Sequence, residues 1–250
     1  MSDDGKRLFV GVRVSVATAN ALAGAVETLA RRAGTTGLAV RWVPPPLYHV
    51  TLKFLGWTHP DALSALRDAL AAAVQGVEPL SFSTARLGAF ADLGNARVIW
   101  AGVSSADDAL GKLARRVDEA TEALGFPSER AGGRPFTGHV TLGRLREPAP
   151  VTELLLPLME QMFSDTKVAG ISLLESVIKS GVLTYRELAY FGFSSSETGR
   201  KRQSLPLQLG LQDPLASRTA LAPQTHEADP HDTHDTHDTD DGWPRGHIPS

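Results

Sequence analysis

The sequence His49-Val50-Thr51-Leu52 occurs a second time as His139-Val140-Thr141-Leu142, 90 residues further along the chain. Polar and apolar residues alternate in both copies, which is the pattern of a β-strand with one polar face and one apolar face. Each strand therefore presents a histidine and a threonine on the same face. We expect the two strands to contribute to one polar site.

The similarity between the two halves extends beyond these tetrapeptides. A shift of 90 residues places strand 7–13 on 97–103, helix 19–33 on 109–123, strand 81–90 on 171–180 and strand 97–103 on 187–193. So long a period is typical of a duplicated unit rather than of a solenoid repeat. The sequence thus predicts an α+β fold of two similar lobes, with antiparallel sheets and outer helices. A pseudo-two-fold axis is expected at a central cleft, where the histidine strands meet.

Hydrophobic periodicity and the positions of glycine and proline predict the individual elements. Strands are expected at 6–14, 40–43, 47–55, 79–88, 96–103, 136–145, 167–177 and 182–193. Helices are expected at 18–33, 60–74, 105–125 and 151–163, the first ending at Gly34 and the last interrupted by Pro157.

Residues 1–194 are predicted to form one domain, because the composition changes after Ser194. Residues 195–250 lack periodicity and contain three consecutive His-Asp-Thr triplets from His231 onward. Such a segment buries too little apolar surface to offset the entropy of ordering, so we expect a disordered tail. Its histidines would attract nickel or zinc if concentrated, but a solvated segment is the preferred interpretation, and we predict no metal site and no cofactor.

Composition and charge limit the catalytic groups and the binding partners that the chain can have. The chain has 250 residues, no cysteine and a net charge of −3, of which residues 1–195 contribute +1 and residues 196–250 contribute −4. A near-neutral body argues against charge-driven binding to duplex nucleic acid, while a local pocket for a small anion stays open. No apolar run approaches the roughly 18 residues of a membrane span. We expect a cytoplasmic protein without a membrane partner, and a monomer.

Two histidines on opposite sides of a cleft suit a reaction in which one proton is removed and another is supplied near neutral pH. Without cysteine or a dense carboxylate cluster, in-line displacement at phosphorus is the natural candidate. Thr51 and Thr141 lie on the histidine faces and can donate hydrogen bonds to phosphoryl oxygens.

The paired motifs resemble those of the two-histidine phosphoesterase superfamily, in particular its RNA 2′,3′-cyclic phosphodiesterase branch, historically called 2′-5′ RNA ligases. The similarity spans about residues 6–193 and is carried by 9–12, by Trp42 with 49–56, by 134–144 and by 174–185. It implies metal-independent opening of a 2′,3′-cyclic phosphate to a 2′-phosphomonoester, with an RNA or nucleotide bearing that end as the partner. It also implies that His49 is the general acid and His139 the base, a division that motif symmetry alone leaves open.

Further substrate contacts are expected from residues near the motifs. Arg144 matches a family arginine, although strict alternation places it opposite the His139 face unless a bulge at Gly143 brings it round. Lys53 lies on the His49 face by alternation and is a second cationic candidate. Trp42 is a candidate for stacking on a base, whereas core packing is expected for Phe9. The loop arginines Arg130 and Arg134 are candidates for contact with RNA phosphates.

Two other functions are consistent with the sequence. One is an RNA-end binding module in which the histidines only recognise phosphate. The other keeps an enzyme but changes its reaction to 2′-5′ ligation or to opening of a cyclic phosphate on a nucleotide.

Overall fold

The computed structural model describes residues 5–128 and 135–194 of the chain. The predicted tail, residues 195–250, and the loop arginines Arg130 and Arg134 lie outside the described residues.

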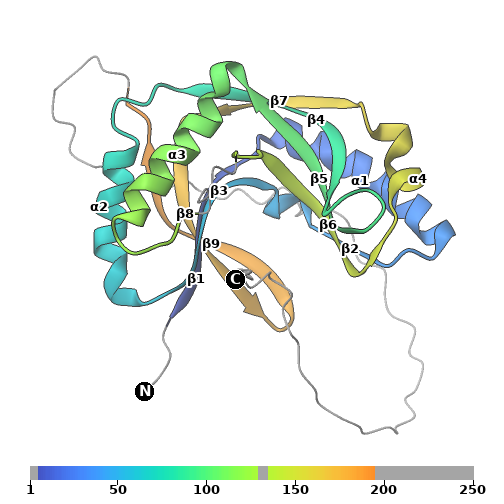
Figure 1. The fold of residues 1–250 in the computed structure, drawn as a ribbon, viewed down its shortest axis with the longest axis horizontal. Coiled ribbons are helices and arrows are strands. Elements are labelled where there is room, and N and C mark those ends of the chain that lie inside the picture. Colours follow the sequence, from blue (N-terminus) through green and yellow to red (C-terminus); the bar gives the residue numbers. More distant parts are fainter. Residues whose placement is uncertain (1–4, 129–134, 195–250) are drawn as a thin grey trace, which may run out of the picture. The chain divides into compact units, whose positions relative to one another are not determined.

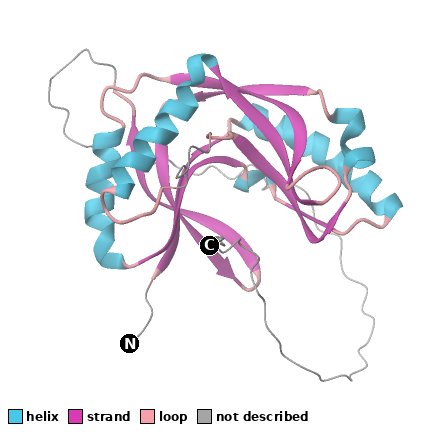
Figure 2. Cartoon of the chain, viewed as in Figure 1, coloured by secondary structure: helices cyan, strands magenta, loops and turns pink. Residues whose placement is uncertain are grey.

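Within the described residues, the strands form one continuous antiparallel sheet in the order β7-β4-β5-β6-β3-β1-β8-β9, with β2 added beside β6 (Figures 1 and 2). Strands β1 to β9 comprise Lys6–Arg13, Val40–Trp42, His49–Thr58, Leu80–Phe90, Ala96–Ser105, His139–Ala149, Met162–Val168, Gly170–Lys179 and Val182–Gly192. The two histidine strands, β3 and β6, are adjacent at the centre, and a single residue pair, Val50 with Val140, joins them. The predicted α+β fold with two lobes is confirmed.

The pseudo-two-fold axis passes between these two valines, which are themselves 90 residues apart. It relates β3 to β6, β1 to β5 and β8 to β4, as the repeat predicted. The predicted match of 97–103 with 187–193 is wrong, because β5 lies inside the sheet between β4 and β6, whereas β9 pairs with β8 at an edge. Strand β5 is already the counterpart of β1, and β9 instead returns from β8 as a hairpin.

The helices cover the outer faces of the two lobes. Helices α1 to α4 comprise Val16–Thr36, Leu63–Ala73, Ala109–Glu122 and Thr152–Leu155. Helix α1 packs against β2, β7 and α4, in the lobe opposite to β1, the strand that precedes it. Helix α3 packs against α2 and against β3 of the opposite lobe, and it also contacts β4 and β5 of its own lobe (Figure 1). This exchange ties the two lobes together.

The bounds of α1 and of the last predicted helix differ from the prediction. Helix α1 begins after Ser15, whose Oγ accepts a hydrogen bond from the Thr18 amide at 3.1 Å, and ends at Gly37 with a φ of 69° rather than at Gly34. The last predicted helix, 151–163, is limited to α4 and a 3₁₀ turn at Leu156–Leu158 that contains Pro157. Strand β7 follows at Met162 and was missed because a short edge strand carries little periodicity.

Matching β-bulges interrupt the two histidine strands at the same place. In β3, Thr51 pairs with Gly11 and Lys53 with Val10, so Leu52 is the extra residue. In β6, Thr141 pairs with Trp100 and Gly143 with Ile99, so Leu142 is the extra residue. A bulge reverses the alternation of side chains beyond it. Residues 53 and 143 therefore turn toward the buried face, and residues 54 and 144 turn toward the histidine face.

Candidate active site

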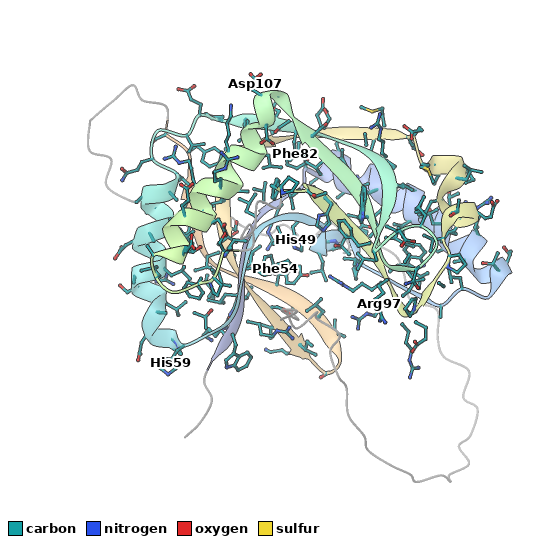
Figure 3. The ribbon with its side chains drawn as sticks, in the orientation of Figure 1. His49, Phe54, His59, Phe82, Arg97 and Asp107 are labelled. Atoms are coloured by element: carbon teal, nitrogen blue, oxygen red, sulfur yellow. The ribbon has the colours of Figure 1, made fainter. Side chains whose placement is uncertain are left out.

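The two histidines are placed by the central strand pair. Because Val50 is opposite Val140, the antiparallel register puts His49 beside Thr141 and Thr51 beside His139. Val50 and Val140 are fully buried, which leaves the four polar residues on the other face of the sheet. Figure 3 shows His49 in the middle of the molecule, between the two groups of helices. The predicted polar pair on each strand therefore lies at one junction.

Both imidazole rings are oriented by the backbone just ahead of their strands. His49 Nδ1 lies 2.7 Å from the carbonyl oxygen of Leu47, and His139 Nδ1 lies 2.8 Å from that of Thr137. A carbonyl oxygen only accepts hydrogen bonds, so each Nδ1 carries the proton and donates it. In the neutral rings, Nε2 is then the unprotonated nitrogen. His49 Nε2 lies 3.0 Å from Thr51 Oγ1, which can donate to it.

Burial lowers the pKa of both imidazoles. It lowers the pKa of His49 to about 4, and the charges of His139, Arg13 and Arg144 act in the same direction. The pKa of His139 is also lowered, by burial first and then by Arg144. The backbone hydrogen bond to each Nδ1 opposes these effects only in part. Both histidines are therefore neutral at pH 7 in the free protein.

Arg144 lies on the histidine face because of the bulge at Leu142. The sequence-based prediction placed this bulge one residue later, at Gly143. Its charge acts on both histidines, and it interacts with the Tyr185 hydroxyl. Arg41 pairs with Arg144 in the β2–β6 register, and Arg13 pairs with His49 in the β1–β3 register. Among the described residues, three guanidinium groups thus border the site, and the sequence indicated only that of Arg144.

The expected place of Lys53 on the histidine face is corrected by the structure. The bulge in β6 turns Arg144 toward the histidines, and the equivalent bulge in β3 turns Lys53 away from them. Its side chain is fully buried, and its Nζ lies 2.6 Å from Asp118 Oδ1 in α3. The ammonium also donates to the carbonyl oxygen of Pro127. Lys53 is therefore part of the interior, and we do not include it among the proposed substrate contacts.

Trp42 also lies on the other side of the sheet. It pairs with Gly143, and a Cβ atom added at Gly143 would come within 2.9 Å of the Trp42 ring. Gly143 points away from the histidine face, so Trp42 does too. With Ala23 and Val26 of α1, Trp42 lines a hollow of about 250 Å³ on that side. The predicted stacking of Trp42 on a substrate base therefore has no support in this geometry.

Aromatic rings on the histidine face surround the imidazoles instead. The Phe9 and Tyr185 rings lie 4.9 and 5.0 Å from the His49 ring, and the Phe90 ring lies 4.9 Å from the His139 ring, all centre to centre. Phe9 is buried, as expected for a packing residue, but it packs beneath the site. Phe54 lies on the same face next to Phe9 and is 38% exposed (Figure 3).

Five residues at the site were not expected from the sequence: Tyr185, Phe90, Arg13, Arg41 and Phe54. Phe54 and Arg144 occupy the same position after their motifs, so a signal for Phe54 was present in the repeat. The other four come from strands other than those of the motifs, and only strand order brings them to the site.

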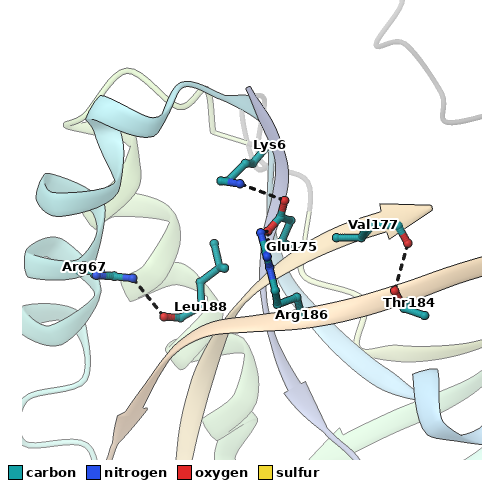
Figure 4. Close-up of polar contacts among 7 residues, drawn as sticks. All are labelled: Lys6, Arg67, Glu175, Val177, Thr184, Arg186 and Leu188. Atoms are coloured by element: carbon teal, nitrogen blue, oxygen red, sulfur yellow. Dashed lines mark hydrogen bonds and ion pairs between the residues drawn. The ribbon is translucent and has the colours of Figure 1, made fainter. Parts of the chain in front are cut away.

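Ion pairs connect β1, β8 and β9 on the face of the sheet opposite to Tyr185 (Figure 4). Glu175 accepts a hydrogen bond from Arg186 Nε at 2.9 Å and another from Lys6 Nζ at 3.3 Å. These contacts link β1, β8 and β9 one residue from Tyr185. The hairpin is thereby fixed beside the strand on which His49 packs.

Membrane-spanning helices and clustered metal ligands are both absent from the part of the chain that the structure describes. None of the described helices is long and apolar enough to cross a membrane. The described residues also contain no group of three or more histidine, aspartate or glutamate side chains placed to hold a metal ion.

The fold and the site define a two-lobed protein in which duplicated His-x-Thr strands meet at one cleft face. The chain belongs to the 2′-5′ RNA ligase superfamily, whose family model matches residues 19–177. The family predicted from the sequence is thereby confirmed.

Curated relatives support the same family. The chain is 28% identical to an RNA 2′,3′-cyclic phosphodiesterase of Archaeoglobus fulgidus over 74% of this chain and 99% of the relative. It is 40% identical to an RNA 2′,3′-cyclic phosphodiesterase of Geobacillus stearothermophilus, but that match covers only 41% of this chain and 32% of the relative.

Solved structures share the architecture. The crystal structure of TT0787 of Thermus thermophilus matches with a TM-score of 0.63 and 26% identity, covering 77% of this chain and all of that one. Escherichia coli LigT complexed with 3′-AMP matches with a TM-score of 0.57 and 20% identity, covering 76% of this chain and 99% of that one. The second likeness establishes the fold alone.

Proposed function

We propose that the protein hydrolyses RNA 2′,3′-cyclic phosphate ends to 2′-phosphomonoesters by two-histidine acid and base catalysis without a metal ion. The observation that carries the proposal is the matched pair of imidazoles, each with its Nδ1 proton donated to a backbone carbonyl. This anchoring leaves Nε2 of each ring for the reaction. The curated relatives that bear the name of this enzyme, and membership in the superfamily, support the choice of reaction.

In the proposed reaction, His139 Nε2 accepts a proton from a water molecule as its oxygen attacks phosphorus. The bond from phosphorus to the 3′-oxygen breaks on the opposite side, and His49 Nε2 supplies the proton that converts this oxygen to a hydroxyl. The new phosphomonoester stays on the 2′-oxygen. Acid and base groups on opposite sides of one phosphorus atom are what an in-line displacement requires. The assignment of His49 as the acid and His139 as the base follows the family resemblance.

Thr51, Thr141 and Arg144 are the proposed phosphate contacts. The two hydroxyl groups lie beside the imidazoles, and the Arg144 guanidinium lies on the same face. Such donors stabilise the negative charge that develops on the phosphoryl oxygens in the transition state. Both histidines come from one chain, so we also propose that a monomer is a complete catalyst.

The lowered pKa of His49 has a consequence for this mechanism. A general acid must carry a proton, yet His49 is neutral in the free protein at pH 7. The anionic cyclic phosphate favours the protonated imidazole when it binds. His49 therefore takes up its proton together with the substrate, and Arg13 opposes protonation until the anion is present.

The test uses an oligonucleotide with a 2′,3′-cyclic phosphate end in buffer containing EDTA. Replacing His49 or His139 by alanine should lower kcat by roughly 10²- to 10⁴-fold, the usual contribution of a general acid or base. His59→Ala is the matched control, because His59 is exposed at the start of a helical turn far from the site (Figure 3). Full activity in either site variant, or complete loss of wild-type activity in EDTA, would refute the proposed mechanism.

The alternatives predict other outcomes. An RNA-end binding module would bind the cyclic end tightly and form no product. A 2′-5′ ligase would join a cyclic-phosphate end to a 5′-hydroxyl strand, and a nucleotide phosphodiesterase would prefer a cyclic mononucleotide over the oligonucleotide.

A further inference from the structure

A second exposed aromatic residue lies on the histidine face of β3. Trp57 is 58% exposed and pairs with Arg7 of β1. Phe9, two residues from Arg7 on the same strand, lies under His49, so Arg7 and Trp57 share the histidine face. The Trp57 ring lies over the backbone of Gly5, because a Cβ atom added there would fall within the ring. The indole is therefore held against the sheet with much of its surface open to solvent.

The residues of β1 that pair with β3 give the spacing of the side chains along this face. His49, Phe54 and Trp57 pair with Arg13, Phe9 and Arg7, respectively. The Phe54 ring lies 6.4 Å from the Phe9 ring, which itself lies 4.9 Å from the His49 ring. At a rise of about 3.3 Å per residue along β1, the backbone position of Trp57 lies about 7 Å beyond that of Phe54. The two exposed rings thus follow one another in a line that leads away from the reaction centre, at a separation that adjacent bases of an extended strand can span.

Resting on the proposed function, we propose that Trp57 is a stacking platform for the base of the second nucleotide of a single-stranded RNA substrate. The base of the terminal nucleotide then lies against Phe54. The preferred substrate is therefore an RNA strand of at least two nucleotides rather than a cyclic mononucleotide.

The chemistry of the surface fits this ligand. Stacking on an aromatic ring is the common way in which proteins hold unpaired bases, and it tolerates any base because every base has a flat π-face. The register also places Arg7 beside Trp57 on the same face of the sheet. The other lobe places Arg144, not an aromatic ring, at the position equivalent to Phe54. Among the described residues, the line of exposed aromatic rings therefore lies in the His49 lobe only, and this asymmetry sets the direction in which the RNA strand leaves the site.

The test compares a mononucleotide 2′,3′-cyclic phosphate with a dinucleotide that ends in the same group. Trp57→Ala should lower kcat/KM for the dinucleotide by roughly 5- to 150-fold, the range for loss of one stacked base. Its kcat/KM for the mononucleotide should equal that of the wild type, which also shows that the variant is folded. Trp57→Phe should keep most of the dinucleotide rate. Leu156→Ala is the matched control, since Leu156 is 59% exposed and lies outside the site.

An equal loss of kcat/KM on both substrates in Trp57→Ala, or no loss on the dinucleotide, would refute the proposal that Trp57 is a stacking platform. A binding measurement separates this outcome from failure of the proposed reaction. The wild type should bind a dinucleotide 2′-phosphate more tightly than a mononucleotide 2′-phosphate, and Trp57→Ala should remove the difference even in a protein that hydrolyses neither substrate. Identical binding differences in the wild type and in Trp57→Ala would refute the platform on their own.

Discussion

Replacing Lys53 by methionine separates a structural role of this residue from a role in substrate binding. Methionine keeps a long unbranched side chain in the buried space and removes the positive charge. The Asp118 carboxylate, whose side chain is only 5% exposed, then loses its ammonium partner at 2.6 Å. The carbonyl oxygen of Pro127 loses a donor as well.

The expected loss of stability follows from the burial of this pair. Removing one partner of a buried ion pair costs about 3–5 kcal/mol in unfolding free energy. Ser128 Oγ still donates to Asp118 Oδ2 at 2.5 Å, so the lower end of this range, about 3 kcal/mol, is expected. For a domain of this size the melting temperature should fall by about 6–12 °C.

The assay is urea denaturation of the wild type, Lys53→Met and the double variant Lys53→Met with Asp118→Leu. The double variant should recover most of the stability, because apolar replacement of both partners removes the buried carboxylate along with the ammonium. At a temperature where all three proteins are folded, kcat/KM should be unchanged. Wild-type stability in Lys53→Met, or a large loss of kcat/KM in a fully folded sample, would refute this description of Lys53.

Three further predictions concern the site and the bulges. Arg144→Ala should lower kcat/KM by roughly 10- to 150-fold through loss of a charge-assisted hydrogen bond, with partial recovery in Arg144→Lys, and a wild-type rate in the alanine variant would exclude Arg144 as a phosphate contact. Gly143→Ala should lower the unfolding free energy by about 1–3 kcal/mol in urea, because the added methyl group would lie 2.7 Å from Val40 Cγ1; an unchanged midpoint would contradict this packing. Because folding lowers the pKa of His49 from 6.5 to about 4, the stability gained from its neutral imidazole is present above pH 6.5 and lost as the pH falls toward 4. Urea titrations should therefore show a smaller loss over that pH range in His49→Gln than in the wild type, and parallel curves would count against a buried neutral imidazole.

The sequence predicted the central strand pair well, because the alternating His-Val-Thr-Leu motif is a local pattern and occurs twice. Alternation placed His49 with Thr51 and His139 with Thr141, and the structure has both pairs on one face. The shift of 90 residues predicted the pseudo-two-fold axis, which passes between Val50 and Val140.

Alternation failed where a bulge interrupts it. From the sequence, a bulge is expected beside Arg144 but strict alternation at the equivalent place in the first motif. Leu52 and Leu142 are both extra residues, and the same displacement that brings Arg144 to the histidine face carries Lys53 into the interior. Applying the repeat consistently would have exchanged Lys53 for Phe54 among the candidates.

Other site residues could not be found from local patterns. Tyr185 and Phe90 come from β9 and β4, strands that reach the histidines only through the order of the sheet. Trp42 illustrates the converse, because its place in the sequence is close to His49 but its register with Gly143 turns it toward α1. Distance along the chain from the motifs therefore predicts neither the presence of Tyr185 and Phe90 at the site nor the absence of Trp42 from it.

Phosphorus NMR of the product tests the central claim most directly. A cyclic-phosphate-ended oligonucleotide incubated with the protein in EDTA should lose its cyclic phosphate signal and gain that of a 2′-phosphomonoester alone, and His139→Ala should leave the substrate largely unchanged. A 3′-phosphomonoester product, or a cyclic phosphate that persists with the wild-type protein, would contradict the proposed reaction.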